Sequence, residues 1–437
     1  MKNIFYKDKY VTKIFNIVRG ANAKAWIVGG AIRDYLINHH SDDIDFVINI
    51  DINLFIERIS NKNIKINKKN IKYKTISIKL GNKEYQITSF RKDLISFGRS
   101  ACVDFTLTLE EDAKRRDFTI NALYLDEGGK LIDPFNGYND IMNKKLRFIG
   151  NPLNRIEEDY LRIFRFCRFF GTFPEVDFDH SLKTKIITKA NKISYLSNMR
   201  IRNELYKIFM VTNFELCLSM IVTLQLDKYM LIKNDKGNQI KRHSGFKTKD
   251  FKIIEYLKKN ALNFIDHEKL DLISILMPHL YSLNKIAMII KRFELNNRKI
   301  NFLNFIKKIK KNKITVNQNL INNLSSTELE LYVLKIIWKY RCKINTEKKG
   351  FFIKDRIPFN WYKLGLIHVF PIEVIKQIDL FNLEWPLLPL TSKRILDLQC
   401  KTYFCKINDL AFRAEDFWVN NNFKSSQKKI MNFLKNN

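Results

Sequence analysis

The chain has few of the residues that interrupt or cross-link a fold. Its 437 residues include only 14 glycines, 8 prolines and 6 cysteines. The cysteines are scattered, and only Cys400 and Cys405 lie close together, with no histidine cluster beside them. The sequence therefore predicts neither a disulfide framework nor a zinc site, and reduced thiols are typical of the cytosol.

Long apolar runs are scarce as well. No stretch reaches the roughly 18 apolar residues that a transmembrane helix needs. The basic N-terminus has neither a continuous apolar segment nor a small-residue cleavage site, so we expect no secretory signal. Together with the reduced thiols, these absences predict a cytoplasmic protein.

Acidic residues are outnumbered by basic ones. The chain carries 77 lysines and arginines against 45 aspartates and glutamates, which gives a formal net charge of +32. Such an excess predicts a polyanionic partner, which is either nucleic acid or an anionic membrane surface. We favour nucleic acid.

Two patterns of secondary structure divide the sequence. Short β-rich runs alternate with helical ones up to about residue 150, and helical periodicity then continues with few glycines or prolines. Strands are expected at 25–28, 44–48, 75–80 and 85–90. The sequence thus predicts an α+β fold, with an N-terminal head built on a small mixed or antiparallel sheet and an all-α remainder.

The most informative stretch is 28–48. An apolar strand ends at Gly29 and Gly30, and the chain returns as a β-rich run that contains Asp43 and Asp45. Residues i and i+2 of a strand face the same way, so the two carboxylates project together and a divalent metal would relieve their repulsion. The glycines would let the backbone approach a phosphate at the next helix N-terminus. Each motif alone is more often a turn or a solvated edge, but their order and spacing are typical of nucleotidyl transfer.

Two further blocks carry polar residues at telling positions. RRDFTINAL, at 115–123, offers arginines that could pair with a triphosphate and polar groups for ribose hydroxyls. EEDYLRIFRFCRFF, at 157–170, predicts one helix in which Asp159 faces the packed side and pairs with Arg162 at i+3. By spacing alone, the second block is more often an ordinary helix salt bridge.

Taken together, these blocks resemble the signature of the class II tRNA nucleotidyltransferases and bacterial poly(A) polymerases. DPFNGYND, at 133–140, is similar to the hinge of that family, and 98–113 looks like its flexible loop. The resemblance covers about residues 20–210. It implies four domains: a catalytic head at 1–145, a helical neck with the nucleotide-template motif at 146–215, a helical body at 216–340 and a tRNA-binding helical tail at 341–437.

The resemblance also implies a role for each motif. Asp43 and Asp45 would be the catalytic residues and would hold Mg²⁺. Three other groups would bind the nucleotide: Gly29, Gly30 and Arg33 at the triphosphate, Arg116, Asp117 and Asn121 at the ribose, and Asp159 and Arg162 at the base. Arg165 would also bind the nucleotide.

The chain departs from the family at two positions. Relatives often have glutamate where this chain has Gln86, and usually also where it has Met199. Glutamine supplies no charge, so either two aspartates suffice for metal binding or activity is reduced.

The implied activity is addition of C, C and A to the 3′ end of tRNA, with CTP and ATP as substrates. Poly(A) polymerases of the family carry a basic Gly-Arg-Arg-Phe element that is missing from 75–81, which favours CCA addition. An A-adding enzyme that works with a C-adding partner remains an alternative. A non-catalytic RNA-binding protein on a decayed head is the competing class, and the intact motifs argue against it.

Overall fold

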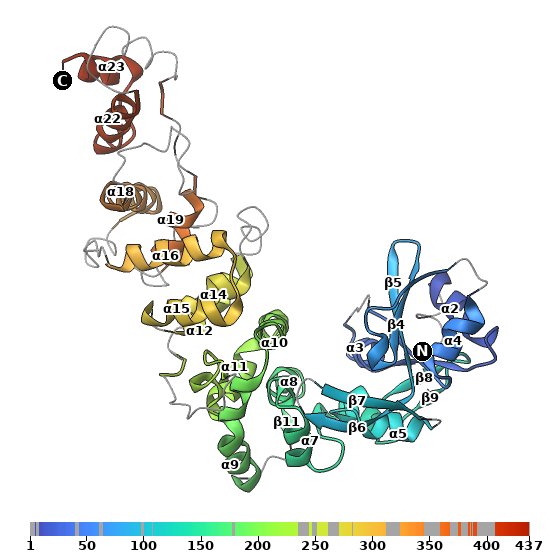
Figure 1. Ribbon diagram of the computed structural model, residues 1–437. Helices are drawn as coiled ribbons and strands as arrows, with labels where there is room; N and C mark the ends of the chain where they lie inside the picture. Colours follow the sequence, from blue (N-terminus) through green and yellow to red (C-terminus); the bar gives the residue numbers. More distant parts are fainter. Residues whose placement is uncertain are drawn as a thin grey trace. The chain divides into compact units, whose positions relative to one another are not determined.

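The computed structural model consists of two compact units, Met1–Gly245 and Phe246–Asn437 (Figure 1). The structure describes residues 5, 8–39, 43–60, 64–97, 100–106, 108–176, 180–234, 244–246, 251–260, 271–281, 283–311, 324–344, 359–367, 375–376, 383–384, 386, 388–390 and 407–436. Each unit is described here by itself, and the predicted four-domain boundaries stay a prediction.

The first unit begins with the head. Its strands are β1 (Ala25–Val28), β2 (Asp45–Ile48), β3 (Lys65–Asn67), β4 (Thr75–Leu80), β5 (Lys83–Ser89), β6 (Arg91–Phe97), β7 (Ser100–Phe105), β8 (Tyr124–Asp126) and β9 (Leu131–Ile132). Its helices are α2 (Lys9–Arg19), α3 (Gly30–Leu36), α4 (Ile52–Ile59), α5 (Leu109–Lys114), α6 (Gly137–Met142) and the short 3₁₀ turns Ile71–Tyr73 and Thr119–Asn121.

A seven-stranded sheet organises the head. The strand order is β3-β4-β5-β2-β1-β8-β9, and β2 and β5 are the one parallel pair among neighbours that are otherwise antiparallel. Apolar side chains such as Val28, Val47 and Phe90 pack with Tyr124 into a buried cluster at this sheet. The predicted mixed sheet and all four predicted strands are confirmed, within a residue or two at their ends.

The segment 98–113 differs from the predicted flexible loop. Its described residues form β7, which pairs with β6 as an antiparallel hairpin, and then α5. Thr108 caps α5 by accepting a hydrogen bond from the Glu111 N–H, which explains why a helix begins there.

The rest of the first unit is mainly helical. Its helices are α7 (Pro152–Glu158), α8 (Leu161–Phe170), α9 (His180–Lys189), α10 (Asn198–Met210), α11 (Phe214–Thr223) and the 3₁₀ turns Ala190–Tyr195 and Leu226–Lys228. One short parallel ladder, β10 (Lys145–Leu146) with β11 (Glu175–Val176), interrupts the predicted all-α character.

The single helix predicted over 157–170 is wrong. The helix ends at Glu158, and Asp159 adopts an extended backbone with φ −154° and ψ 105°. Its side chain accepts a hydrogen bond from the Leu161 N–H at 3.0 Å, as a capping residue does, and α8 then begins.

All described elements of the second unit are helical. They are α12 (Phe251–Asn260), α14 (Leu272–Leu280), the 3₁₀ turn Leu283–Lys285, α15 (Ile286–Phe293), α16 (Asn297–Lys311), α18 (Ser326–Ile344), α19 (Phe359–Leu366), α22 (Ile407–Asn420) and α23 (Gln427–Asn436). The predicted α+β class, a sheet-based head followed by helices, is confirmed. Within the described residues, no helix combines the length and apolar character needed to span a membrane.

Candidate nucleotide-transfer site

Two carboxylates stand where β2 begins. Asp45 is the first residue of the strand, Asp43 precedes it by two positions, and both are exposed. Desolvation by surrounding protein atoms raises the pKa of Asp45, Arg116 opposes that rise, and the charge of Asp43 adds to it. The charge of Asp43 thus acts on Asp45, as expected for two aspartates that lie close together. Only Asp45 lies within the strand.

Gln86 lies directly beside this pair in the sheet. In the parallel ladder between β2 and β5, Asp45 is the register partner of Gln86. Register partners on adjacent strands face the same side, so a longer carboxylate at position 86 would reach the same space. In this chain the position supplies an uncharged amide.

Glycine is required where β1 turns into α3. Gly29 has φ +71°, a left-handed conformation, and its N–H donates to the Leu123 carbonyl at 3.0 Å. A Cβ atom there would lie 3.4 Å from the Arg116 guanidinium. The backbone of Gly29 thus passes close to one of the arginines predicted to bind nucleotide, and Gly30 opens α3.

Arg33, on α3, is held in place on several sides. It donates to the Asp34 carboxylate at 2.6 Å and to the Asn121 side-chain oxygen at 2.5 Å. Its guanidinium lies 4.8 Å from the centre of the Phe169 ring. Burial lowers the pKa of Arg33, and the nearby Arg168 and Arg165 act in the same direction while Asp34 opposes them. Three arginines meet at this ring, because Arg165 and Arg168 also lie over Phe169.

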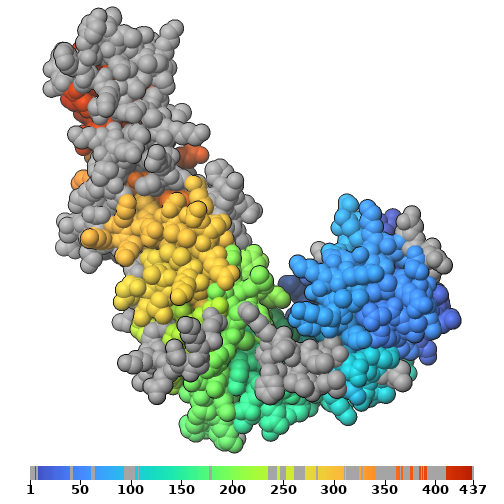
Figure 2. All heavy atoms as spheres, in the orientation of Figure 1, coloured from blue at the N-terminus to red at the C-terminus, as the bar shows by residue number. Residues whose placement is uncertain are grey.

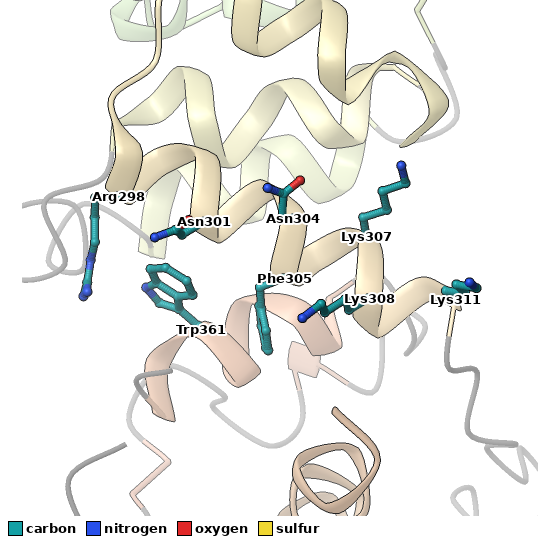
Figure 3. Close-up of a pocket in the computed structure, with 8 residues that line it drawn as sticks. All are labelled: Arg298, Asn301, Asn304, Phe305, Lys307, Lys308, Lys311 and Trp361. Atoms are coloured by element: carbon teal, nitrogen blue, oxygen red, sulfur yellow. The ribbon is translucent and has the colours of Figure 1, made fainter. Parts of the chain in front are cut away.

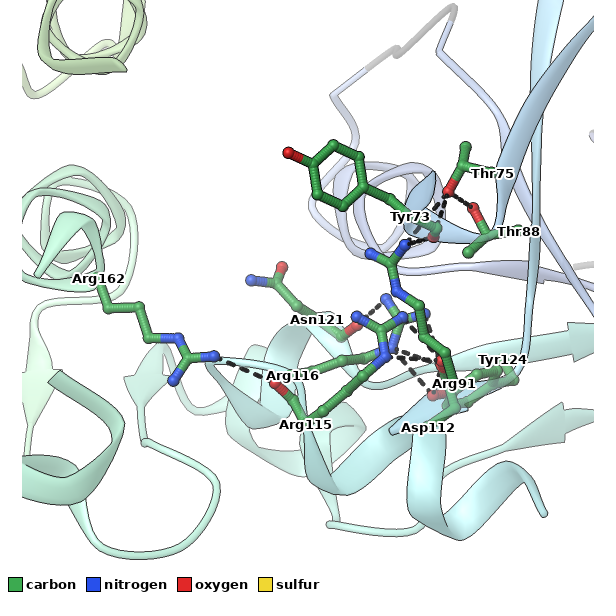
Figure 4. Close-up of polar contacts among 10 residues, drawn as sticks. All are labelled: Tyr73, Thr75, Thr88, Arg91, Asp112, Arg115, Arg116, Asn121, Tyr124 and Arg162. Atoms are coloured by element: carbon green, nitrogen blue, oxygen red, sulfur yellow. Dashed lines mark hydrogen bonds and ion pairs between the residues drawn. The ribbon is translucent and has the colours of Figure 1, made fainter. Parts of the chain in front are cut away.

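Asp112 organises the arginines of the second block (Figure 4). One carboxylate oxygen accepts from Arg115 at 2.7 Å, and the other accepts from Arg116 at 2.9 Å and from the Tyr124 hydroxyl at 2.8 Å. Burial alone would raise the pKa of Asp112, but Arg115 and Arg116 outweigh it, so the pKa lies well below its usual range. Arg116 is therefore fixed before any ligand arrives.

Asp117 is equally engaged. It accepts from the Asn121 amide at 2.9 Å and from Arg165 of α8 at 2.5 Å. Burial alone would raise the pKa of Asp117, but Arg165 and these hydrogen bonds outweigh burial, so the pKa lies well below its usual range. The structure brings the predicted ribose residues and Arg165 into one network that joins the head to α8.

Arg162 does not pair with Asp159 as predicted. It donates to Glu158 at 2.5 Å, and also to the main-chain carbonyls of Arg155 and Arg115 at 2.8 and 3.3 Å. The break after Glu158 explains the correction, because it turns Asp159 away from the helical i+3 position.

Asp159 instead binds a residue of another helix. Its second oxygen accepts from Arg200 of α10 at 2.6 Å. Glu204, one turn further along α10, accepts from Arg168 of α8 at 2.5 Å. These two ion pairs hold α10 against the segment that carries Asp159 and Arg162.

Sequence reasoning did not predict the contacts of the residues that support the site, although Asp112, Arg200 and Glu204 match motifs of the family that the chain resembles. The supporting residues are Asp112, Tyr124, Arg155, Glu158, Arg168, Arg200 and Glu204. Asp112 had a signal, since a carboxylate three and four residues before two arginines on a helix is placed to pair with both. The Arg200 contact spans 41 residues of sequence and left no local pattern.

Within the part of the chain that the structure describes, the two aspartates are not joined by a larger cluster of metal-ligating groups. Among the described residues, no three His, Cys, Asp or Glu side chains gather in a way that could hold a metal ion. Two carboxylates nevertheless match what Mg²⁺ takes from a protein, since it is usually bound by one or two carboxylates plus substrate phosphates and water.

Parts of the chain are similar to known proteins. Residues 25–147 match the family described as the poly A polymerase head domain. Human CCA tRNA nucleotidyltransferase 1, mitochondrial, is 38% identical over 212 residues, which are 48% of this chain and 49% of that protein. The CCA-adding enzyme of Streptococcus uberis is 34% identical over 219 residues, 50% of this chain and 53% of that protein. The matching region thus spans about half the length of these curated relatives.

Solved structures share the fold over nearly the whole chain. The Bacillus stearothermophilus CCA-adding enzyme in complex with CTP has a TM-score of 0.62 at 19% identity and covers 98% of both chains. The Thermotoga maritima CCA-adding enzyme complexed with tRNA has a TM-score of 0.66 at 17% identity, over 98% of this chain and 95% of that one.

The head of the chain is thus similar to the poly A polymerase head domain, and its N-terminal half is similar to CCA tRNA nucleotidyltransferases and CCA-adding enzymes. The solved structures show that the fold is shared with CCA-adding enzymes.

Proposed function

We propose that the chain is a Mg²⁺-dependent nucleotidyltransferase that adds C, C and A to the 3′ end of tRNA. CTP and ATP would be its substrates, and pyrophosphate would leave. The observation that carries the proposal is the pair Asp43 and Asp45 at the exposed start of β2, near a network of partly buried arginines. The names of the relatives support the choice of tRNA as acceptor.

Asp43 and Asp45 would hold the Mg²⁺ ions. When bound, these ions would lower the pKa of the terminal 3′-OH and stabilise the charge on the leaving pyrophosphate. The chain's own contribution is the position of both carboxylates at one strand end, with desolvation already acting on Asp45.

Arg33 and the glycine turn would bind the triphosphate. Arg33 is oriented by Asp34, Asn121 and the Phe169 ring, so its charge needs no rearrangement on binding. Gly29 and Gly30 would let the main chain pass close to the phosphates.

The ribose and base would meet residues that are held by protein partners. Arg116, Asp117 and Asn121 would face the ribose, while Asp159, Arg162 and Arg165 would face the base. Arg162 and Asp159 keep 11% and 24% of their side chains exposed, so hydrogen-bonding groups remain accessible. Because they are held by Glu158 and Arg200, they could present a fixed pattern of donors and acceptors to cytosine or adenine.

The test is incubation of purified protein and Mg²⁺ with a tRNA that ends at its discriminator base. CTP alone, ATP alone and both together would be supplied, and the products sequenced. Ends that read CCA with both nucleotides are expected. Addition of A only to a pre-made CC end would assign an A-adding enzyme, and long A tails on unrelated RNA would assign a poly(A) polymerase. No product at all would favour the non-catalytic binder.

A further inference from the structure

Phe169 of α8 has three arginines around its ring. Measured from the central guanidinium carbon to the ring centre, Arg168 lies at 4.0 Å, Arg33 at 4.8 Å and Arg165 at 5.6 Å. All three distances are within the roughly 6 Å over which the face of an aromatic ring attracts a cation. The ring thus contacts one arginine of α3 and two arginines of its own helix.

Elsewhere in the described structure, one cation pairs with one ring. In the second unit, Arg298 lies 4.8 Å from the centre of the Trp361 ring, beside a cavity between α16 and α19 (Figure 3). A single cation also lies over each of four tyrosine rings, those of Tyr10, Tyr73, Tyr124 and Tyr195. Like charges repel, so three guanidiniums can gather at one ring only where other contacts oppose their repulsion.

The carboxylates that pair with these three arginines come from three segments of the first unit. They are Asp34 of α3, Asp117 of the segment before the turn Thr119–Asn121, and Glu204 of α10. In the space-filling view, the cyan end of the head continues into the teal and green helices that follow it (Figure 2). Phe169 therefore lies where residues of the head, α8 and α10 meet.

Phe169 completes a closed set of contacts. Arg33 donates to the Asn121 side-chain oxygen at 2.5 Å, and the Asn121 amide donates to Asp117 at 2.9 Å. Asp117 accepts from Arg165 at 2.5 Å, and Arg165 lies at the ring that Arg33 also contacts. Arg33 would bind the triphosphate, whereas Asp117 and Asn121 would face the ribose. The ring therefore connects residues proposed for two different parts of the nucleotide.

Aromatic packing fixes the position of the ring itself. Phe169 is only 3% exposed, and its ring packs edge-on against that of Phe118, with 5.4 Å between the ring centres. Phe118 is buried and packs in turn against Phe148, at 4.6 Å. Because the site is largely removed from water, the attraction between ring and guanidinium is stronger than it would be at an exposed site.

The positive charge of Arg33 is only partly balanced by the protein. Burial, Arg168 and Arg165 lower the pKa of Arg33, whereas Asp34 raises it, and the net direction is downward. A bound anion would favour the charged guanidinium, and a triphosphate offers several acceptor oxygens. The contacts of Arg33 thus hold it in place and still favour a phosphate ligand.

We propose that Phe169 is a positioning residue for triphosphate binding: its ring holds Arg33 beside Arg165 and so aligns the triphosphate contact with the ribose contacts. The ring itself would touch no part of the nucleotide. The inference rests on the proposed function, because it takes the triphosphate of CTP or ATP as the ligand of Arg33.

The experiment measures steady-state transfer by the full-length chain, with CTP on tRNA that lacks its CCA end and with ATP on tRNA that ends in CC. Inhibition by inorganic tripolyphosphate is measured alongside. In Phe169→Leu, which removes the ring, the KM for both nucleotides and the Ki for tripolyphosphate should each rise about tenfold. The kcat should stay within about threefold of the parent value, and the KM for tRNA should be unchanged. Tripolyphosphate has neither ribose nor base, so its Ki isolates the triphosphate contact.

Phe164→Leu is the matched control. Phe164 is a buried phenylalanine of the same helix, and no cation among the described residues lies over its ring. The same truncation there should change KM and Ki by no more than about twofold. Equal effects of the two variants, or an unchanged Ki in Phe169→Leu, would overturn the proposal.

Phe169→Met guards against a folding defect. Methionine is a flexible apolar side chain that fills irregular space in a core, but it lacks the aromatic face. The KM and Ki should rise by about the same factor as in Phe169→Leu. Each variant is checked for a thermal unfolding transition that matches the parent protein, and if Phe169→Leu lacks one, Phe169→Met decides. Parental KM and Ki in a folded Phe169→Met would overturn the proposal.

Binding of tripolyphosphate, measured by calorimetry, separates this proposal from the proposed reaction. If the parent protein transfers no nucleotide but binds tripolyphosphate about tenfold more tightly than Phe169→Leu, the reaction proposal fails and the role of Phe169 stands. If the parent protein transfers nucleotides and Phe169→Leu has the parental KM and Ki, the role of Phe169 fails and the reaction stands.

Discussion

The molecule arranges positive charge in two different ways. In the first unit, the arginines near the two aspartates are partly buried and bound by carboxylates, as Arg116 is by Asp112 and Arg165 by Asp117. In the second unit, exposed lysines line a cavity whose described walls hold no carboxylate. Fixed planar guanidiniums can present a defined pattern of donors, whereas hydrated lysines on flexible stems attract phosphate without selecting a base. The contrast separates a region suited to discrimination from one suited to affinity.

The largest effect should come from Asp45→Asn. The change preserves shape and removes a charge proposed to hold the metal, so nucleotide transfer should fall by roughly three orders of magnitude or more. Single-turnover transfer to tRNA is the measurement. Glu127→Gln, at an exposed carboxylate of the head, is the matched control and should transfer normally. If Asp45→Asn binds tRNA as tightly as the parent protein, Asp45 acts in the reaction and not in RNA binding. Full activity of Asp45→Asn would contradict the proposed metal site.

Asp112→Asn tests whether the ion pairs of Asp112 hold Arg115 and Arg116 in place before a ligand binds. The change leaves Arg115 and Arg116 without their buried counter-charge, so the free energy of unfolding of the head should fall by about 3–5 kcal/mol. Urea unfolding measures the loss, and hydrogen exchange of β1 and β8 amides assigns it to the first unit. A loss below that of Glu127→Gln would mean that the ion pairs are dispensable.

The same carboxylate predicts an acid response. Because the pKa of Asp112 is lowered in the folded state, its stabilising contribution is complete above the unfolded-state value of about 4 and is lost as the pH falls below it. The stability of the parent protein should therefore decline more steeply below that pH than the stability of Asp112→Asn. Parallel pH profiles of the two proteins would refute this account.

Arg200→Ala should alter the choice of nucleotide more than the rate of nucleotide transfer. Removal of the guanidinium frees Asp159 from its fixed orientation, so discrimination of CTP against UTP should weaken by roughly tenfold while tRNA affinity is retained. Competition assays with both nucleotides measure the ratio. Arg202→Ala, two positions along the same helix, is the control. Intact discrimination would remove Asp159 from the base-recognition role.

Gln86→Glu should give the smallest change. The side chain at 86 is the register partner of Asp45, so a carboxylate there should lower the Mg²⁺ concentration needed for half-maximal transfer by a few-fold. A Mg²⁺ titration of the rate measures the shift. An increase in the required Mg²⁺ would show that repulsion among three carboxylates outweighs the added ligand.

The sequence predicted what local patterns encode. The strands of the head and the paired aspartates follow from β-branched runs and from i, i+2 spacing. The contacts of Asp159 could not be predicted, because its partner Arg200 lies on another helix and the extended backbone at 159 breaks the assumed periodicity. The supporting residue Glu204 and the cavity at Trp361 likewise depend on packing between helices that only the folded chain brings together.

The carbonyl contacts of Arg162 have a consequence for the tolerance of the chain to sequence change. Two of its acceptors are main-chain oxygens, those of Arg155 and Arg115, and a main-chain oxygen is present whatever side chain the residue carries. Substitutions at 115 or 155 that preserve the backbone therefore leave these acceptors available. The side chains around Arg162 can therefore change during evolution while the backbone continues to orient its guanidinium.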